Sequence, residues 1–155
     1  GVHIKYKKQN LYQSLSSYGI AIHRHNSEIQ QELDLCTERK NTFQFTPHLT
    51  PMFRGILSTI YVDMNKGVTK NKVVSLLNSF YRKEFFVKIA KTDTLLSTNS
   101  VINTNKCIIS VCQSKYKNKL IILSVIDNLI KGGSGQAVQN MNIYFNLNEN
   151  EGLND

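Results

Sequence analysis

Two histidines stand two positions apart in the segment His23-Arg24-His25, and the acidic residue Glu28 follows three positions later. On an extended segment the two imidazoles would face the same side. They can share a metal ion, or one of them can act as a general acid or base near neutral pH. The spacing alone favours the simpler interpretation, two ordinary polar residues at the end of a strand. Glu28 would lie in the first turn of a helix, where the helix dipole favours a carboxylate.

A second segment, residues 46–56, contains Pro47, Pro51 and, near its end, Arg54. Proline fixes its own φ angle and restricts the residue before it, so we expect a rigid loop here. The Arg54 guanidinium can bind a phosphate or a carboxylate through two parallel hydrogen bonds. The alternative is a rigid turn whose arginine faces solvent, and the residue types alone do not name a ligand.

The third segment, residues 127–142, is rich in glycine at its centre, with Gly132, Gly133 and Gly135. Glycines before a helix allow a ligand to approach the backbone closely, or they form a flexible turn. The segment has neither the G-x-G-x-x-G fingerprint of dinucleotide sites nor the G-x-x-x-x-G-K-[ST] phosphate loop. The residues themselves therefore indicate at most an anion or nucleotide contact.

The chain has three cysteines, Cys36, Cys107 and Cys112. An odd number without a signal sequence predicts free thiols in a reducing compartment, the cytoplasm. The C-x4-C spacing of the last two, with no second pair, is a poor match to a zinc site, so no metal is expected. The longest strongly apolar run, residues 120–126, is too short to cross a bilayer, so no membrane partner is expected.

The composition is typical of a globular domain: 155 residues, of which 41% are hydrophobic, and a formal net charge of +8. This length suits a single domain, residues 1–155. A basic chain can bind nucleic acid, but the lysines are scattered, with local density only at 5–8 and 115–119. Arginine-rich stretches with interleaved aromatic residues are missing. A solvated basic surface is the simpler interpretation, and no nucleic-acid partner is expected.

The hydrophobic pattern predicts the elements that must position these residues. Alternation predicts strands at residues 20–22, 42–46, 55–64, 85–89, 106–114 and 119–126. Helical spacing predicts helices at residues 27–37, 69–82 and 136–145. The last two strands are expected to form a hairpin, and the polar tail from residue 146 is expected to fray. The fold class is therefore α+β, with a mostly antiparallel sheet covered by helices.

Three long motifs, in this order, carry a resemblance to a known family. They are His-Arg-His-x-x-Glu-Ile at 23–29, Thr-Pro-x-Leu-x-Pro-x-x-Arg-Gly-Ile at 46–56, and Asp-Asn-Leu-x-Lys-Gly-x-x-Gly-Gln-Ala-Val-Gln-Asn-Met-Asn at 127–142. Together they resemble the C-terminal substrate and dimerisation domain of N-acetyl-gamma-glutamyl-phosphate reductase. The resemblance covers nearly the whole chain. It implies a C-terminal domain like that of glyceraldehyde-3-phosphate dehydrogenase, with homo-oligomers formed through the sheet.

The resemblance also implies a reaction, the NADPH-dependent reduction of N-acetylglutamyl phosphate to its semialdehyde with release of phosphate, in arginine biosynthesis. In this family a cysteine thiolate attacks the acyl phosphate and a histidine acts as acid and base. By resemblance that histidine is His23, because a neutral imidazole can accept the thiol proton. Glu28 would position the imidazole or the substrate.

The other implied site residues are contacts to substrate and cofactor. Arg24, His25 and Arg54 are the expected anion contacts. Gly135, Gln136 and Asn140 would lie on the nicotinamide side of NADP, in the helix that follows the glycines.

The chain departs from the family pattern in two ways. None of its three cysteines lies in the Gly-Cys-Tyr-Pro-like turn of the family's nucleophile, and the Rossmann fingerprint is missing. We therefore expect the nucleotide-binding domain to be absent from this chain and the chain alone to be inactive. Two alternatives stay open: a reductase for carrier-protein-bound aminoadipyl phosphate in lysine biosynthesis, and a non-catalytic dimerisation or regulatory domain.

Overall fold

A computed structural model of the chain describes residues 13–37 and 39–153. Their contacts divide the chain into two compact units, residues 1–53 and residues 54–155. The lysine-rich start at residues 5–8 lies outside the described residues. Each unit is considered by itself below.

The first unit contains one helix and a minimal two-stranded ladder. Strand β1 (Ser16–Ser17) pairs antiparallel with β2 (His48–Leu49), and helix α1 (His25–Thr37) lies between them in sequence. The helix predicted at 27–37 is confirmed and begins two residues earlier. Its residues are all at least partly exposed.

Two strands predicted in this unit are wrong. Residues 20–22 form a turn in which Ile22 donates its backbone N–H to the Gly19 carbonyl, and Ala21 takes a positive φ of 61°. At residues 42–46 the predicted alternation is real, since Phe43 and Phe45 are half-buried and their neighbours are exposed. That segment nevertheless joins no ladder, because pairing among the described residues of this unit is confined to β1 and β2.

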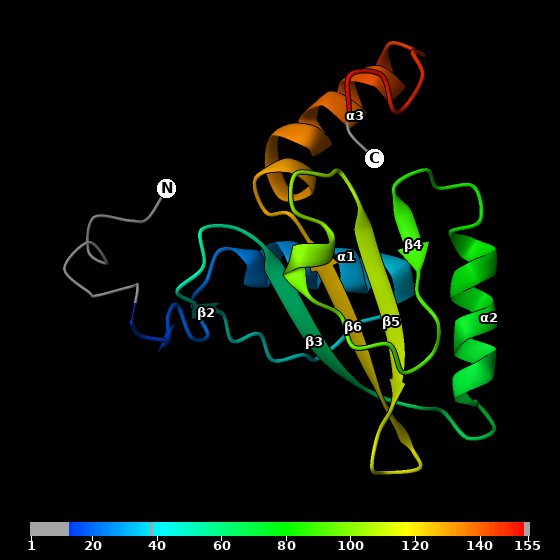
Figure 1. The fold of residues 1–155 in the computed structure, drawn as a ribbon. Helices are drawn as coiled ribbons and strands as arrows, with labels where there is room; N and C mark the ends of the chain where they lie inside the picture. Colours follow the sequence, from blue (N-terminus) through cyan, green and yellow to red (C-terminus); the bar gives the residue numbers. More distant parts are fainter. Residues whose placement is uncertain (1–12, 38, 154–155) are drawn as a thin grey trace. The chain divides into compact units, whose positions relative to one another are not determined.

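The second unit is built on a four-stranded sheet of order β3-β6-β5-β4 (Figure 1). Its strands are β3 (Ile56–Asp63), β4 (Val87–Ile89), β5 (Cys107–Gln113) and β6 (Lys119–Ile126). β3 and β5 pair antiparallel with β6, and β4 pairs parallel with β5. The predicted strands, the hairpin and the mostly antiparallel character are all confirmed.

Helix α2 (Lys70–Phe80) lies beside β4 and contacts β4 and β5 (Figure 1). Thr69 caps its start by accepting a hydrogen bond from the Lys72 backbone N–H at 3.3 Å. Val73 and Leu77, on the stripe predicted to pack, are half-buried. Leu76 and Phe80 of that stripe are exposed, at 66% and 71%.

After β6 the chain turns into the segment that carries the third motif. A short π-helical turn, η3 (Ile130–Ser134), leads into α3 (Gly135–Tyr144), which confirms the predicted last helix. The fraying predicted from residue 146 is wrong for residues 147–151. Asn142 donates from its side-chain amide to the carbonyl oxygens of Glu149 and Glu151, at 3.2 and 2.9 Å. These hydrogen bonds hold the polar tail against α3.

Candidate functional site

His23 lies two residues before α1, on a turn rather than on the extended strand expected from its sequence. Its imidazole is half-buried among aromatic rings, with centroid distances of 5.2 Å to Tyr18, 4.6 Å to His25 and 5.5 Å to Phe45. The rings of His23 and His25 are therefore neighbours, as predicted, although the turn brings them together instead of strand alternation. Phe45 supplies an apolar wall for both.

The remaining residues of this motif follow the course of the helix. His25 is the first residue of α1, and its Nε2 lies 3.8 Å from the Glu28 carboxylate on the exposed surface. Arg24 is exposed, and its carbonyl oxygen accepts a hydrogen bond from the Ser27 hydroxyl at 2.9 Å. Glu28 stands in the first turn of α1, as predicted.

The pKa of His23 is lowered from its ordinary value. Burial among the rings is the largest cause, followed by the electrostatic effects of His25 and Arg24. Glu28 acts in the opposite direction but is outweighed. His23 is therefore a neutral imidazole at neutral pH.

The second unit is organised around one buried carboxylate, Asp127, whose side chain is fully buried. One oxygen accepts backbone N–H hydrogen bonds from Leu129 at 2.8 Å and Ile130 at 3.2 Å. The other accepts the backbone N–H of Asn103 at 2.9 Å and lies 3.2 Å from Nη1 of Arg54. Asp127 thus ties the end of β6 to the start of the π-helical turn, to the 101–104 loop and to Arg54, two residues before β3.

These contacts set the ionisation of Asp127. Burial alone would raise the pKa of this carboxyl, but the three backbone N–H bonds and the Arg54 guanidinium together outweigh burial and lower it. Arg54 also donates to the side-chain oxygen of Asn103. The guanidinium predicted to bind an external anion therefore has an internal carboxylate as a partner.

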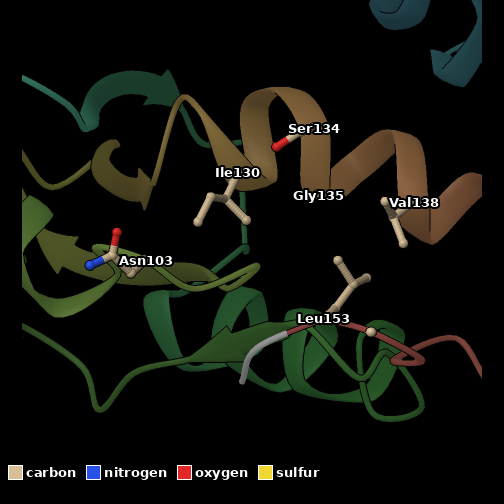
Figure 2. Close-up of a pocket in the computed structure, with 7 residues that line it drawn as sticks. Asn103, Ile130, Ser134, Gly135, Val138 and Leu153 are labelled. Atoms are coloured by element: carbon tan, nitrogen blue, oxygen red, sulfur yellow. The ribbon is translucent and has the colours of Figure 1, made fainter.

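Gly135 begins α3 at a place where a side chain does not fit. A Cβ added there would lie 2.4 Å from Oδ1 of Asn105 and 2.6 Å from Cγ2 of Ile130. Beside this close approach lies a cavity of about 220 Å³, which is lined by Asn103, Ile130, Ser134, Gly135, Val138, Gly152 and Leu153 (Figure 2). Glycine is needed at 135 because the helix start passes directly over the buried amide of Asn105.

The polar face of α3 belongs to a hydrogen-bonded network. The Gln139 side-chain oxygen accepts from the amide of Asn105 at 2.9 Å and from Nζ of Lys131 at 2.6 Å, and its amide donates to Glu149 at 2.7 Å. Burial lowers the pKa of Lys131, although Cys107 and the carboxylates nearby oppose this shift. The ammonium lies 5.5 Å from the centroid of the Phe86 ring. Lys131 and Glu149 thereby join the turn before α3 to the segment after it.

The predicted cofactor contacts Gln136 and Asn140 lie on α3 one turn apart. Gln136 donates from its side-chain amide to Asn140 at 2.8 Å, and both lie on the exposed side of the helix. Gly135 lies at the start of the same helix and is buried. The three predicted residues are therefore brought together on one helix.

All three cysteines are free thiols, as predicted, with Cys36 exposed and Cys107 and Cys112 half-buried on β5. Across residues 13–37 and 39–153, no group of three histidine, cysteine or acidic side chains is arranged to hold a metal. A helix long and apolar enough to cross a membrane is also lacking in this part of the chain.

The structure thus divides the predicted residues between the two units. His23, Arg24, His25 and Glu28 lie together in the first, and Arg54, Gly135, Gln136 and Asn140 lie in the second. Sequence reasoning did not assign roles to the buried polar residues Asp127, Asn105 and Gln139. Two of them, Asp127 and Gln139, lie inside the third motif. Their polar side chains within that long motif were the available signal for a structural role.

Comparison with known proteins decides the family. The family model for the semialdehyde dehydrogenase dimerisation domain matches residues 2–128. The chain belongs to this family. The match spans both units and the first two motifs, and it ends where the third motif begins.

Individual relatives are more specific, and they confirm the resemblance found in the motifs. The chain is 42% identical over 153 residues to the N-acetyl-gamma-glutamyl-phosphate reductase of Desulforamulus reducens, which covers 99% of this chain and 44% of that protein. It is 49% identical over 138 residues to the protein of that name from Pelobacter propionicus, covering 88% of the chain and 40% of the relative. The chain therefore spans about two fifths of the length of these relatives.

Solved structures confirm the fold. The aspartate semialdehyde dehydrogenase from Francisella tularensis superposes with a TM-score of 0.67 over 88% of this chain and 40% of that one, at 15% identity. An aspartate semialdehyde dehydrogenase II from Vibrio cholerae matches 74% of the chain with a TM-score of 0.57 at 14% identity. The chain therefore has the fold of a semialdehyde dehydrogenase dimerisation domain.

Proposed function

We propose that this chain is the substrate-binding and dimerisation part of an NADPH-dependent N-acetyl-gamma-glutamyl-phosphate reductase. The enzyme would convert N-acetylglutamyl 5-phosphate to N-acetylglutamate 5-semialdehyde and phosphate in arginine biosynthesis, in the cytoplasm. The observation that carries the proposal is identity of 42–49% to proteins of that name through nearly the whole chain. Their names favour this substrate over aminoadipyl phosphate.

In this proposal His23 is the imidazole beside the reacting carbonyl carbon. Its neutral state at neutral pH and its apolar surroundings suit a group that must exchange or share a proton near pH 7. Arg24, His25 and Glu28 lie beside it and are the proposed contacts to the charged substrate. Arg54 contributes through Asp127, because its guanidinium holds the turn that precedes α3.

The nucleophilic thiol is proposed to come from a region outside these 155 residues. Cys107 and Cys112 lie within the hydrogen-bonded strand β5, and Cys36 lies near the end of α1 with its side chain exposed. Lys131 and Cys107 interact electrostatically, but none of the three cysteines lies in the Gly-Cys-Tyr-Pro-like turn that holds the family's nucleophile. The relatives are more than twice as long as this chain, which leaves room for a nucleophile and a nucleotide site elsewhere.

The NADP cofactor, which supplies the hydride when bound, fits this chain only at its edge. The cavity beside Gly135 has about 220 Å³, less than sites that enclose a drug-sized ligand, and the backbone approach at Gly135 is already filled by Asn105. The proposed contacts are therefore limited to Gly135, Gln136 and Asn140 on α3. Most of the nucleotide would be held elsewhere.

The sheet is the proposed surface for a homo-oligomer. On β3 the apolar residues Ile56, Leu57, Ile60 and Tyr61 are exposed, at 42%, 48%, 44% and 72%. Successive strand residues point to opposite faces, so Ile56 and Ile60 expose apolar surface on one face of β3 and Leu57 and Tyr61 on the other. Exposed apolar surface of this kind is typical of an interaction surface. The family description, a dimerisation domain, supports the same assignment.

A complementation assay tests the proposed function. The chain is mixed with a separately produced nucleotide-binding part of one of the relatives, and NADPH formation is followed by absorbance with N-acetylglutamate semialdehyde, phosphate and NADP. We expect activity only in the mixture, and its loss in His23→Ala. Activity of the chain alone would contradict the proposed external nucleophile. Activity with the aminoadipate semialdehyde analogue in preference to the acetylglutamate compound would contradict the proposed substrate.

A further inference from the structure

The buried side of α3 is polar. Three residues of this helix are buried, and they are Gly135, Gln139 and Asn142. They stand four and then three positions apart, which places them on one stripe of the helix. The buried stripe of a helix is ordinarily apolar, and apolar contacts are non-directional. Here the rotation of α3 about its own axis depends on hydrogen bonds, which have fixed directions.

The side-chain amide of Gln139 has only one satisfactory orientation. Its oxygen accepts from Nζ of Lys131 at 2.6 Å, and an ammonium can only donate. Its nitrogen donates to a carboxylate oxygen of Glu149 at 2.7 Å, and an ionised carboxylate can only accept. The oxygen also accepts at 2.9 Å from the amide of Asn105, which lies in the loop before β5. With the amide turned the other way round, donors would face donors and acceptors would face acceptors.

The segment after α3 is held to the helix independently of the Glu149 carboxylate. The side-chain amide of Asn142 donates to the backbone oxygens of Glu149 and Glu151. The backbone N–H of Leu147 donates to the Asn142 carbonyl at 2.8 Å. These bonds use backbone atoms of the segment, so they remain when the side chain of residue 149 is changed. What the carboxylate adds is its hold on Gln139.

Charge strengthens this hold. Burial is the largest influence on the pKa of Lys131 and lowers it, whereas Cys107, Glu149 and Glu84 act in the opposite direction and favour the ammonium. The amide of Gln139 therefore bridges an ammonium on one side and a carboxylate on the other. Hydrogen bonds to ionised groups are about twice as strong as those between neutral groups. Gln139 is thus the best-anchored side chain of the buried stripe.

The proposed cofactor contacts lie on the stripe next to this one. Gln136 stands three positions before Gln139, and Asn140 directly follows it. Since a short helix turns as one body, a rotation that moves Gln139 moves the other two residues as well. Side-chain tips lie about 5–6 Å from the axis of a helix, so a rotation of about 10° displaces them by about 1 Å. A displacement of this size is enough to weaken a hydrogen bond to a ligand.

We propose, building on the reductase function above, that Glu149 is a positioning residue for the cofactor contacts of α3. Its carboxylate holds Gln139, and Gln139 fixes the rotation at which Gln136 and Asn140 face the nicotinamide side of NADP. Without the carboxylate α3 would occupy several rotations, of which only some fit the cofactor. The apparent affinity for a ligand falls in proportion to the fraction of the protein that is competent to bind it. Glu149 thereby raises the affinity for NADP without touching it.

Three variants in the complementation assay test this role. Glu149→Ala removes the acceptor, Glu149→Gln keeps an acceptor oxygen, and Glu151→Ala is the matched control. Glu151 lies on the same segment with an exposed side chain, and its contact with Asn142 is made by its backbone oxygen. We expect Glu149→Ala to raise the KM for NADP about five- to tenfold while kcat changes less than about twofold. Glu149→Gln should stay within about twofold of the wild-type KM, because an amide oxygen also accepts.

The split between KM and kcat separates positioning from folding. A variant that only folds less well has fewer active molecules, so its apparent kcat falls while its KM stays the same. An unchanged KM in Glu149→Ala would overturn the proposal. So would an equal rise of KM in Glu151→Ala, or a KM in Glu149→Gln as high as in Glu149→Ala.

NMR of the chain alone tests the positioning without NADP and without activity. In ¹H–¹⁵N spectra the amide signals of Gln136 and Asn140 are identified by their absence from Gln136→Ala and Asn140→Ala. We expect these signals to shift in Glu149→Ala, to return towards their original positions in Glu149→Gln and to stay in place in Glu151→Ala. Unshifted signals in Glu149→Ala would overturn the proposal. An inactive wild-type mixture would contradict the reductase function, and the spectra would then decide the role of Glu149 by themselves.

Discussion

Replacing Asp127 with asparagine should destabilise the second unit more than any other change of equal size. The carboxylate accepts three backbone N–H bonds and pairs with Arg54, and its side chain is fully buried. Asparagine has almost the same shape but carries an NH₂ group in place of one oxygen. Both carboxylate oxygens face donors, so no orientation of the amide satisfies them all.

The size of the effect follows from which donors lose their acceptor. One orientation leaves the N–H of Leu129 and Ile130 facing the NH₂ group, and the other leaves Asn103 and Arg54 facing it. Each buried donor without an acceptor costs about 1–3 kcal/mol. Removing one partner of a buried ion pair costs about 3–5 kcal/mol. We therefore expect Asp127→Asn to lower the free energy of unfolding by about 3–5 kcal/mol, a large part of the stability of a small domain.

Urea unfolding measures this change. The chain has seven tyrosines and no tryptophan, so circular dichroism and tyrosine fluorescence are the probes. The matched control is Asp93→Asn, because Asp93 also accepts a backbone N–H and pairs with a lysine but is exposed. We expect an unfolding midpoint close to that of the wild type for the control. A loss below about 1 kcal/mol in Asp127→Asn, within the range of ordinary surface substitutions, would refute the reasoning.

Three further predictions concern the same unit. Gly135→Ala should lower the free energy of unfolding by about 1–3 kcal/mol, because the added methyl group overpacks against Ile130. Gly132→Ala should lower it less, because its nearest neighbour is a movable methyl group at 3.2 Å. Thermal unfolding compares the two variants. Acid should destabilise the unit, because the pKa of Asp127 is lowered in the folded state. The contribution of this carboxylate to the free energy of unfolding is complete above the unfolded pKa of about 3.9 and disappears as pH falls through the lower folded pKa. Unfolding free energies at pH 5 and pH 2.5 should differ less in Asp127→Asn than in the wild type. Thr69→Ala should cost about 1 kcal/mol by removing the cap of α2, which urea unfolding would register.

The regular elements of the second unit could be predicted because their sequences carry strong periodicity. Strand residues 56–63 and 119–126 alternate or run apolar, and helix residues 70–80 repeat at helical spacing. The two wrong strands fell in the first unit, where pairing among the described residues is limited to two residues per strand. There the Gly19 turn overrides the alternation at residues 20–22. The alternation at residues 42–46 reflects the partial burial of Phe43 and Phe45, with no partner strand among the described residues. Alternation reports which side chains are buried, and a ladder additionally needs a neighbouring backbone.

The candidate site divides in the same way. The motifs identified the segments that contain His23, Arg54 and Gly135, because each of these residues lies within its own long pattern. What they could not reveal was the internal pairing of Arg54 with Asp127, or the contact of Asn105 with Gln139, since these partners are far apart in sequence. The hydrogen bond that Nδ1 of His23 accepts from the backbone N–H of His25 could not be predicted either, because it depends on where α1 begins.

The polar interior explains why the third motif is so long. Among the described residues the fully buried apolar side chains are Phe86, Val101, Val111, Leu120 and Val125, and as many polar ones are buried with them. Apolar contacts are non-directional, so a core of this size would leave the turn before α3 poorly specified. Hydrogen bonds of Asp127 and Gln139 have fixed directions and a high cost when unmet. They define where η3 ends, where α3 begins and where the tail returns. A residue that takes part in such a network cannot change without a change in its partner, and a run of such residues gives a motif longer than any ligand contact would require.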